Sequence, residues 1–196
     1  MEQTLSHDFR THKESLLHLL RNFSVEHREV TLASGQTSSF YLDCRQIYFR
    51  GEAHFLIGEI FWQKLIEIEK KHECFMSACG GMAMGCIPLS LALSAAAFRR
   101  GRELPGFAVR KEAKEHGMQS IIEGSKCLKP HSQVVIVEDV VTTGGSALKA
   151  IEQLRTMGMV VHHMLAIVDR NQGGKERLAK EHVELESIFN LNDILE

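Results

Sequence analysis

Two adjacent carboxylates, Glu138 and Asp139, stand between an apolar run and a loop rich in glycine and hydroxyl groups. Residues 134–137 before them are β-branched, which is typical of a parallel strand buried on both faces. Residues 142–146 after them read Thr-Thr-Gly-Gly-Ser, and apolar residues then recur at helical spacing over residues 147–158. The sequence therefore predicts a strand, a glycine-rich turn and a helix N-terminus, whose free backbone N–H groups and dipole attract an anion.

The acidic pair indicates which anion this turn would take. Two carboxylates repel a phosphate, but they can accept hydrogen bonds from a neutral diol or help to hold a hydrated divalent cation. A phosphate in the loop with a diol beside the acids describes a ribose 5-phosphate. Each feature alone also fits an acidic strand end, an ordinary glycine turn or a serine that caps a helix, so the hypothesis rests on their order.

A second glycine-rich segment spans residues 79–85 and includes Gly80 and Gly81. It is expected to form a turn before a helix, and it matches neither the P-loop nor the G-x-G-x-x-G pattern. A tight start of the helix would explain it without any ligand. Beside a ribose-phosphate site, its backbone N–H groups could instead cradle a pyrophosphate.

A basic segment follows the next predicted strand. Residues 110–117 read Arg-Lys-Glu-Ala-Lys-Glu-His-Gly, with three cations and a histidine among eight residues. Such charged runs are usually solvated loops. Here Gly117 and Gly124 could act as hinges, and a basic lid would stabilise the charge on a departing pyrophosphate and exclude water from the sugar.

The elements that must position these segments alternate between strands and helices. Strands are expected at residues 74–79, 107–109, 134–137, 164–168 and 187–191, and helices at 82–98 and 147–158. This order predicts an α/β fold with a central, mostly parallel sheet flanked by helices, and with ligands outside the carboxyl ends of the strands. Residues 1–72, with helices at 5–23 and 52–70 around short strands at 29–32 and 40–43, are expected to form a small N-terminal hood. We expect one domain over residues 1–196, with the ribose-phosphate-binding core at 73–196.

Composition narrows the class of protein. The net charge of −2 over 196 residues gives no general attraction to nucleic acid or to an anionic membrane. The polar N-terminus and the lack of an apolar run of about 20 residues predict neither a signal peptide nor a membrane span. Five cysteines without a regular metal spacing suggest reduced thiols in the cytoplasm. His162 and His163 adjoin an apolar run and are expected at an exposed strand or turn position.

The segment 134–146 resembles the binding motif for 5-phosphoribosyl 1-diphosphate (PRPP) of the type I phosphoribosyltransferases. The basic segment 110–117 resembles the catalytic loop of the orotate phosphoribosyltransferases. Three further stretches are similar to parts of that family: 34–43 to its base-binding loop, 80–88 to its pyrophosphate loop, and 168–170 to the strand end that carries the arginine for the orotate carboxylate. The resemblance implies the type I phosphoribosyltransferase fold.

The resemblance also implies a reaction and its residues. Orotate and PRPP would give orotidine 5′-monophosphate and pyrophosphate with Mg²⁺, in a homodimer whose lid is shared between subunits. The residues expected to bind PRPP are Arg110, Lys111, Glu138, Asp139, Thr142, Thr143, Gly144, Gly145, Ser146, Gly80 and Gly81. The residues expected to bind orotate are Arg170, Thr142, Phe40 and Tyr41. The catalytic residues are expected to be Lys114, His116 and Asp139, and no side chain is assigned as a direct metal ligand.

Two positions depart from the family's pattern. Thr37 stands where many members have a basic residue, and Gly85 stands where some have a lysine. The first change either weakens the binding of orotate or PRPP, or requires Arg45 or a backbone N–H group to substitute. Two other functions remain open from the sequence: a phosphoribosyltransferase for another base, and a regulatory module that binds PRPP or a nucleotide without turnover.

Overall fold

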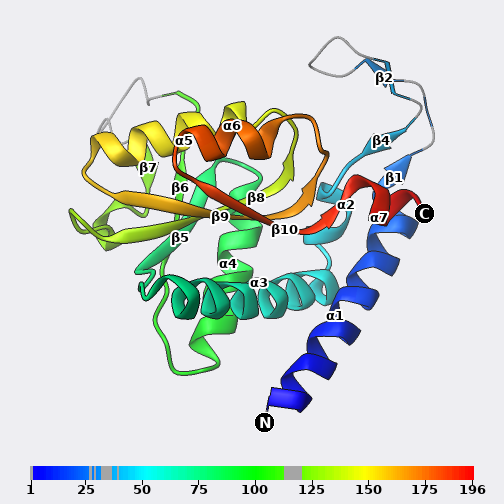
Figure 1. Ribbon diagram of the computed structural model, residues 1–196, viewed down its shortest axis with the longest axis horizontal. Coiled ribbons are helices and arrows are strands. Elements are labelled where there is room, and N and C mark those ends of the chain that lie inside the picture. The colour runs from blue at the N-terminus through cyan, green and yellow to red at the C-terminus, as the bar shows by residue number, and fades with distance from the viewer. Residues whose placement is uncertain (1, 27, 29, 32–36, 39, 113–120) are drawn as a thin grey trace.

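A six-stranded sheet with the strand order β10-β9-β8-β5-β6-β7 forms the centre of the fold (Figure 1). The computed structural model describes residues 2–26, 28, 30–31, 37–38, 40–112 and 121–196. The strands are β5 (Ala78–Met82), β6 (Gly106–Val109), β7 (Ile122–Glu123), β8 (Gln133–Val141), β9 (Val160–Asp169) and β10 (Glu184–Asn190). Neighbouring strands pair in parallel except β6 and β7, which are antiparallel. The expected α/β architecture with a mostly parallel sheet is confirmed.

Helices cover both faces of this sheet (Figure 1). Helices α3 (Gly51–His72) and α4 (Cys86–Phe98) lie on one face, and α5 (Gly145–Thr156) and α6 (Gly174–Lys180) lie on the other. Successive residues of β8 alternate between the two layers: Val135 and Val137 pack in the α3 and α4 cluster, while Val134 and Ile136 pack in the α5 cluster. The continuous β-branched run thus fills two cores, as expected for a strand buried on both faces.

The N-terminal part consists of one long helix, one short helix and four very short strands. These elements are α1 (Glu2–Phe23), β1 (Val25–Glu26), β2 (Val30–Thr31), β3 (Thr37–Ser38), β4 (Tyr41–Leu42) and α2 (Arg45–Tyr48). β1 pairs with β4, and β2 pairs with β3, both antiparallel. Leu16 and Leu20 of α1 are fully buried in the same cluster as α3, so this part is anchored to the sheet through that helix.

The C-terminal helix packs against the C-terminal end of α1, away from the N-terminus (Figure 1). Asn190 and Asp193 cap α7 (Leu191–Leu195) reciprocally. Arg21 of α1 donates hydrogen bonds to the carbonyl oxygens of Asp193 and Ile194 at 2.7 and 3.1 Å. None of the helices within the described ranges is both long and apolar enough to cross a membrane.

Several expected boundaries are wrong. Gly80 and Gly81 were expected in a turn, but they lie inside β5, and the turn follows at Ala83. Glycine is needed there because a Cβ on Gly80 would lie 2.2 Å from the carbonyl oxygen of Phe107 on the neighbouring strand. Glu138 and Asp139 do not end their strand either, because β8 continues to Val141.

Six short elements were not predicted at all, namely β1, β3, α2, β7, α6 and α7, and neither was the 3₁₀ turn Ser125–Cys127. The prediction that both His162 and His163 are exposed is wrong for His163. His162 is exposed, but His163 on the same strand is 93% buried.

Candidate active site at the carboxyl ends of the strands

The two acids on β8 face the turn that joins β5 to α4. An ideal Cβ built on Gly85 in that turn would lie 2.9 Å from Glu138 Oε1 and 3.3 Å from Asp139 Oδ1. The Asp139 carboxylate also accepts a hydrogen bond from the backbone N–H of Val140 at 2.8 Å. The acidic pair therefore points at the turn beyond the sheet edge and not into a hydrophobic core.

Glu138 is an unusual carboxyl group. Burial, followed by the nearby charge of Asp139, raises the pKa of Glu138 well above its usual range, while Lys111 acts in the opposite direction. A buried carboxyl with a neighbouring acid is stabilised by a proton, a hydroxyl donor or a cation. This part of the site is therefore suited to the diol of a sugar or to a cation.

The loop at residues 142–146 leads into α5 as expected. Gly144 takes a left-handed conformation with φ of +73° immediately before the helix, and among the described residues no side chain caps this end. The N–H of Leu148 donates to the carbonyl oxygen of Gly144 at 3.0 Å, which is the first helical hydrogen bond. The earlier N–H groups stay available to an anion at the positive end of a twelve-residue helix.

Helix α6 adds a cation to this loop that the sequence did not reveal. Arg177 Nη1 donates to the carbonyl oxygen of Thr143 at 3.5 Å, and it lies 3.8 Å from an ideal Cβ on Gly145. The close approach is possible because Gly174 lacks a side chain: a Cβ there would lie 2.5 Å from the carbonyl oxygen of Thr142. The helix has only seven residues and no clear apolar period, so sequence patterns gave no signal for it.

The start of the expected lid lies across from the same loop. A pocket of about 410 Å³ is lined by residues that include Arg110, Lys111, Ser146 and Lys149. The guanidinium of Arg110 forms an ion pair with Glu123, at 2.8 Å between Nε and Oε1. The structure thus places the first two cations of the expected lid in one pocket with Ser146 of the expected phosphate loop. Lys114 and His116 lie outside the described residues.

Arg170 follows β9 and is buried beneath the N-terminal part. The residue is only 6% exposed, and its Nε has no hydrogen-bond partner within the described part of the chain. Its guanidinium carbon lies 5.5 Å from the centre of the Phe40 ring. Burial lowers the pKa of Arg170, and the nearby Tyr41 acts in the opposite direction. The backbone N–H of Arg170 donates to Val141 at 2.9 Å, so three of the four residues expected at orotate come together beside the fourth, Thr142.

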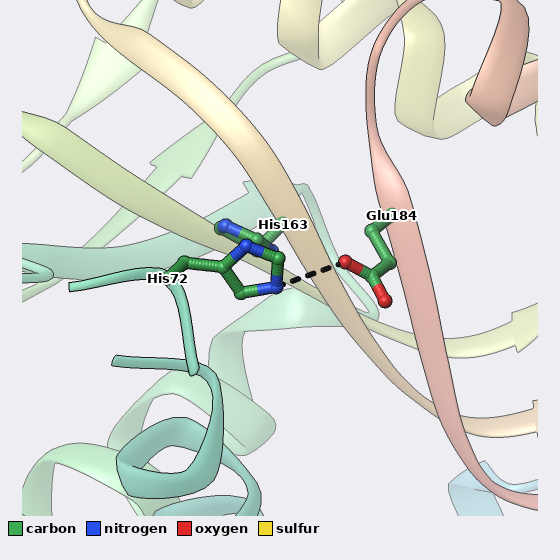
Figure 2. A group of neighbouring side chains, drawn as sticks. All are labelled: His72, His163 and Glu184. Carbon is green, nitrogen blue, oxygen red and sulfur yellow. Dashed lines mark ion pairs between the residues drawn. The ribbon is translucent and has the colours of Figure 1, made fainter. Parts of the chain in front are cut away.

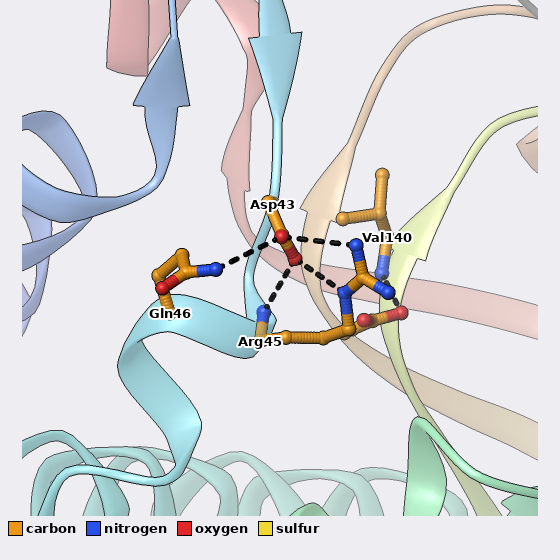
Figure 3. A network of polar contacts seen from close by, with 5 residues as sticks. Asp43, Arg45, Gln46 and Val140 are labelled. Carbon is orange, nitrogen blue, oxygen red and sulfur yellow. Dashed lines mark hydrogen bonds and ion pairs between the residues drawn. The ribbon is translucent and has the colours of Figure 1, made fainter.

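A polar network at the start of α2 flanks the acidic pair (Figure 3). The Asp43 carboxylate accepts hydrogen bonds from Nε and Nη2 of Arg45 at 2.7 and 3.0 Å and from Gln46 at 3.2 Å, and Val140 of β8 lies beside it. The bond from Arg45 lowers the pKa of Asp43. Two of the five N–H donors of the Arg45 guanidinium are thus in use, so its pairing with Asp43 does not prevent Arg45 from serving as the cation missing at Thr37.

The same segment places two neutral groups near Asp139. Burial and then the charge of Asp139 raise the pKa of the Cys44 thiol. The same two causes, in the same order, raise the pKa of Tyr48 to about 12. The N-terminal part therefore forms a wall of the site, and the thiol of Cys44 and the hydroxyl of Tyr48 stay uncharged beside Asp139.

Comparisons with known proteins agree with this geometry. A sequence model of the phosphoribosyl transferase domain matches residues 81–192. The chain is 40% identical over 183 residues to an orotate phosphoribosyltransferase of Sorangium cellulosum, with 93% of each chain covered. It is 35% identical to a solved orotate phosphoribosyltransferase of Mycobacterium tuberculosis, with a TM-score of 0.77 and with 93% of this chain and 98% of the other covered.

A second structure of the M. tuberculosis protein is a complex with PRPP. It has a TM-score of 0.73 and 31% identity, and it covers 94% of this chain and 99% of its own. The likeness extends over the N-terminal part, the sheet and both helical layers. With two acids inside its central strand, a glycine turn at a helix N-terminus and a buried arginine, the chain belongs to the orotate phosphoribosyltransferase family.

Proposed function

We propose that this protein transfers the 5-phosphoribosyl group of PRPP to orotate, giving orotidine 5′-monophosphate and pyrophosphate in pyrimidine nucleotide synthesis. The observation that carries the choice of base is Arg170. A buried guanidinium whose Nε has no hydrogen-bond partner among the described residues is well suited to accept an anion. The carboxylate of orotate can pair with its planar fork in a bidentate manner, while Phe40 covers it from one side.

The remaining residues divide the PRPP molecule between them. Thr142, Thr143, Gly144, Gly145 and Ser146 bind the 5′-phosphate through the free amides and hydroxyls at the start of α5. Glu138 and Asp139 accept hydrogen bonds from the ribose hydroxyls. Arg110 and Lys111 meet the pyrophosphate across the pocket that they share with Ser146. Gly80 and Gly81 lie inside β5 just before the turn at Ala83, and together with that turn they are proposed to contribute to the pyrophosphate site.

The transfer needs little acid–base chemistry from the protein. A ring nitrogen of orotate loses its proton to solvent and forms a bond to C1 of the ribose, as the bond from C1 to the pyrophosphate oxygen breaks. Orotate is an anion with an acidic ring N–H, so positioning and charge stabilisation supply most of the rate. Lys114 and His116 are proposed to stabilise the departing pyrophosphate.

Mg²⁺ is the proposed cofactor. The donor set fits it, because Glu138 and Asp139 offer hard carboxylate oxygens that converge on the turn at Gly85. When bound with PRPP, Mg²⁺ would neutralise part of the pyrophosphate charge. The acids would hold the ion through its water shell. Its positive charge would offset the repulsion between the Glu138 and Asp139 carboxylates.

We propose a cytoplasmic location, because the five cysteines are all unpaired, as expected in the reducing cytoplasm.

We propose a single domain over residues 1–196 that acts as a homodimer, with the segment 110–117 of one subunit completing the site of the other. Mixing two inactive variants, Lys114→Ala and Asp139→Asn, tests the shared lid. Mixed dimers would regain one complete site and partial activity, whereas separate sites would stay inactive.

The central experiment follows the loss of orotate absorbance after PRPP is added, with and without Mg²⁺. Turnover is expected with orotate and not with uracil or purines. Arg170→Ala should lower kcat/KM for orotate by about 10–100-fold, the loss expected for a charged hydrogen bond of roughly 1.5–3 kcal/mol. The control is Arg10→Ala, an exposed arginine of α1. Unchanged orotate turnover in Arg170→Ala would refute the carboxylate assignment, and tight PRPP binding without any product would identify a regulatory module.

A further inference from the structure

Two histidines and a glutamate lie close together toward the amino ends of β9 and β10 (Figure 2). The candidate active site lies at the opposite, carboxyl ends of the strands. His72 ends α3, His163 lies near the start of β9, and Glu184 begins β10. His163 and Glu184 are direct partners in the pairing of the two strands. Asp169, at the carboxyl end of β9, lies six positions beyond His163, a distance of about 20 Å along an extended strand.

The three side chains converge on one point. His72 Nε2 lies 3.1 Å from Glu184 Oε2, and the ring centres of His72 and His163 are 4.6 Å apart. One ligand atom from each of the three residues lies within 4.8 Å of the other two. Two ligands bound at about 2.1 Å to a tetrahedral Zn²⁺ are about 3.4 Å apart, so His72 and Glu184 already have this spacing.

His163 gives an independent reason to expect a ligand. The residue is 93% buried, and within the described residues its Nδ1 is buried without a hydrogen-bond partner. Buried polar atoms in native proteins almost always have partners. A histidine that only filled space in this sheet would need no second histidine and no carboxylate beside it.

We propose that His72, His163 and Glu184 form a Zn²⁺ site. Imidazole nitrogens with one carboxylate oxygen are a common ligand set for zinc, and three protein ligands leave a fourth position for water. That position can open into the adjacent pocket of about 480 Å³, which the three ligands line together with Cys74, His162 and His182.

The charges around the cluster are compatible with a bound cation. Lys71 Nζ contacts Glu184 Oε1 at 2.8 Å, which leaves Oε2 toward the histidines and fixes the orientation of the carboxylate. Glu186 adds a second acid near His163, but it is paired with Lys64 at 3.3 Å. Because Glu186 is already paired with Lys64, Glu184 is the acid on which the site depends. Lys175 also lines the pocket.

Such a site would act on stability and not on the transfer reaction. Its ligands come from the end of α3, from β9 and from the edge strand β10. A bound ion would join the helical layer to the outer edge of the sheet, far from the acids of β8. The prediction therefore has readouts that do not depend on orotate turnover.

The test starts from the full-length protein after treatment with a chelator and dialysis. Titration with ZnCl₂ in a calorimeter should give one ion per chain, and Co²⁺ should give the visible absorption of a low-symmetry site. His72→Ala and Glu184→Gln should each lower zinc affinity at least about 10-fold, since even outer-sphere partners of metal ligands contribute that much. Both side chains are partly exposed, at 33% and 42%, so the variants should fold.

The matched control is His162→Ala, which removes an exposed histidine from the same pocket. Its Nδ1 donates to the carbonyl oxygen of His182 at 3.2 Å, so it is not expected to bind the ion. Zinc should raise the Tm of the wild type and of His162→Ala, but not of the two ligand variants. Absence of stoichiometric zinc binding, or equal affinity in all four proteins, would overturn the proposal and leave an ordinary ion pair beside a buried histidine.

Discussion

Gly85 and Glu138 meet across the candidate site with room for no more than a hydrogen atom. A Cβ on Gly85 would lie 2.9 Å from Glu138 Oε1, although the backbone of Gly85, with φ of −53° and ψ of −39°, is one that any residue can adopt. The glycine is therefore needed for the space it leaves and not for its conformation. The acids of β8 and the turn after β5 form the two sides of one narrow site.

Gly85→Ala should consequently damage function while sparing the fold. The new methyl group would displace the Glu138 carboxylate, and kcat/KM for PRPP should fall by about 10–100-fold, or roughly 1.4–2.7 kcal/mol. The change in Tm should be small, because alanine favours helical dihedral angles. Steady-state kinetics and thermal unfolding would separate the two effects. Gly51→Ala is the control, since its Cβ would meet nothing within 4 Å, and equal kinetics in the two variants would contradict the assigned contact.

The raised pKa of Glu138 predicts a stability that depends on pH. Because burial and Asp139 raise it in the folded state, the contribution is fully present below the unfolded value of about 4.3 and is lost as pH rises through the folded pKa. Above that pH, the ligand-free protein carries an unfavourable buried charge. Glu138→Gln should therefore have a higher Tm than the wild type at pH 8, with the difference shrinking toward pH 4.

Thermal unfolding from pH 4 to 8 without ligands would measure this difference. Glu67→Gln changes an exposed glutamate of α3 and should shift Tm little at any pH. Activity should move in the other direction, because glutamine offers the ribose a weaker acceptor. A Glu138→Gln protein that is less stable than the wild type at pH 8 would show that the carboxylate is favourably paired.

The sequence predicted the strand, the turn and the helix that carry the acidic pair and the Thr142–Ser146 loop, because local patterns determine these elements. The β-branched run of β8 can only fill a strand with two buried faces, and Thr142–Ser146 must turn before the apolar period of α5 begins. Gly80 was misplaced because glycine usually marks a turn. Here glycine is needed because Phe107 on the neighbouring strand leaves no room for a Cβ. Such a demand leaves no trace in the neighbouring residues.

Contacts between distant segments account for the other misses. Arg177 reaches the phosphate loop because Gly174 packs against Thr142, more than thirty residues earlier. His163 is buried because β10 pairs alongside its strand and α3 packs against that strand. The sequence around the exposed His162 gives no sign of this burial. The roles of Lys114 and His116 rest on resemblance, and they stay predictions.

The Asp43 network predicts a second dependence on pH, with the opposite sign. Arg45 lowers the pKa of Asp43, so this carboxylate stabilises the fold above its unfolded value of about 3.9, and the effect is lost as pH falls through the folded pKa. Arg45 is largely exposed, so the pair contributes only about 0.5–1 kcal/mol at pH 7. Asp43→Asn should lower Tm at pH 7 and have no effect at the lowest pH at which the protein folds. Asp8→Asn, an exposed residue of α1, is the control.

Arg177 provides a test of the phosphate loop itself. Its guanidinium lies beside Thr143 and Gly145 but is exposed, so it would add a screened attraction to the 5′-phosphate. Arg177→Ala should raise KM for PRPP about 2–10-fold, a loss of roughly 0.5–1.4 kcal/mol, and should leave KM for orotate unchanged. The loss should shrink as salt is added. Lys180→Ala removes another exposed cation from the same helix and is expected to keep the wild-type KM; an equal loss in both variants would mean that α6 attracts PRPP only through its total charge.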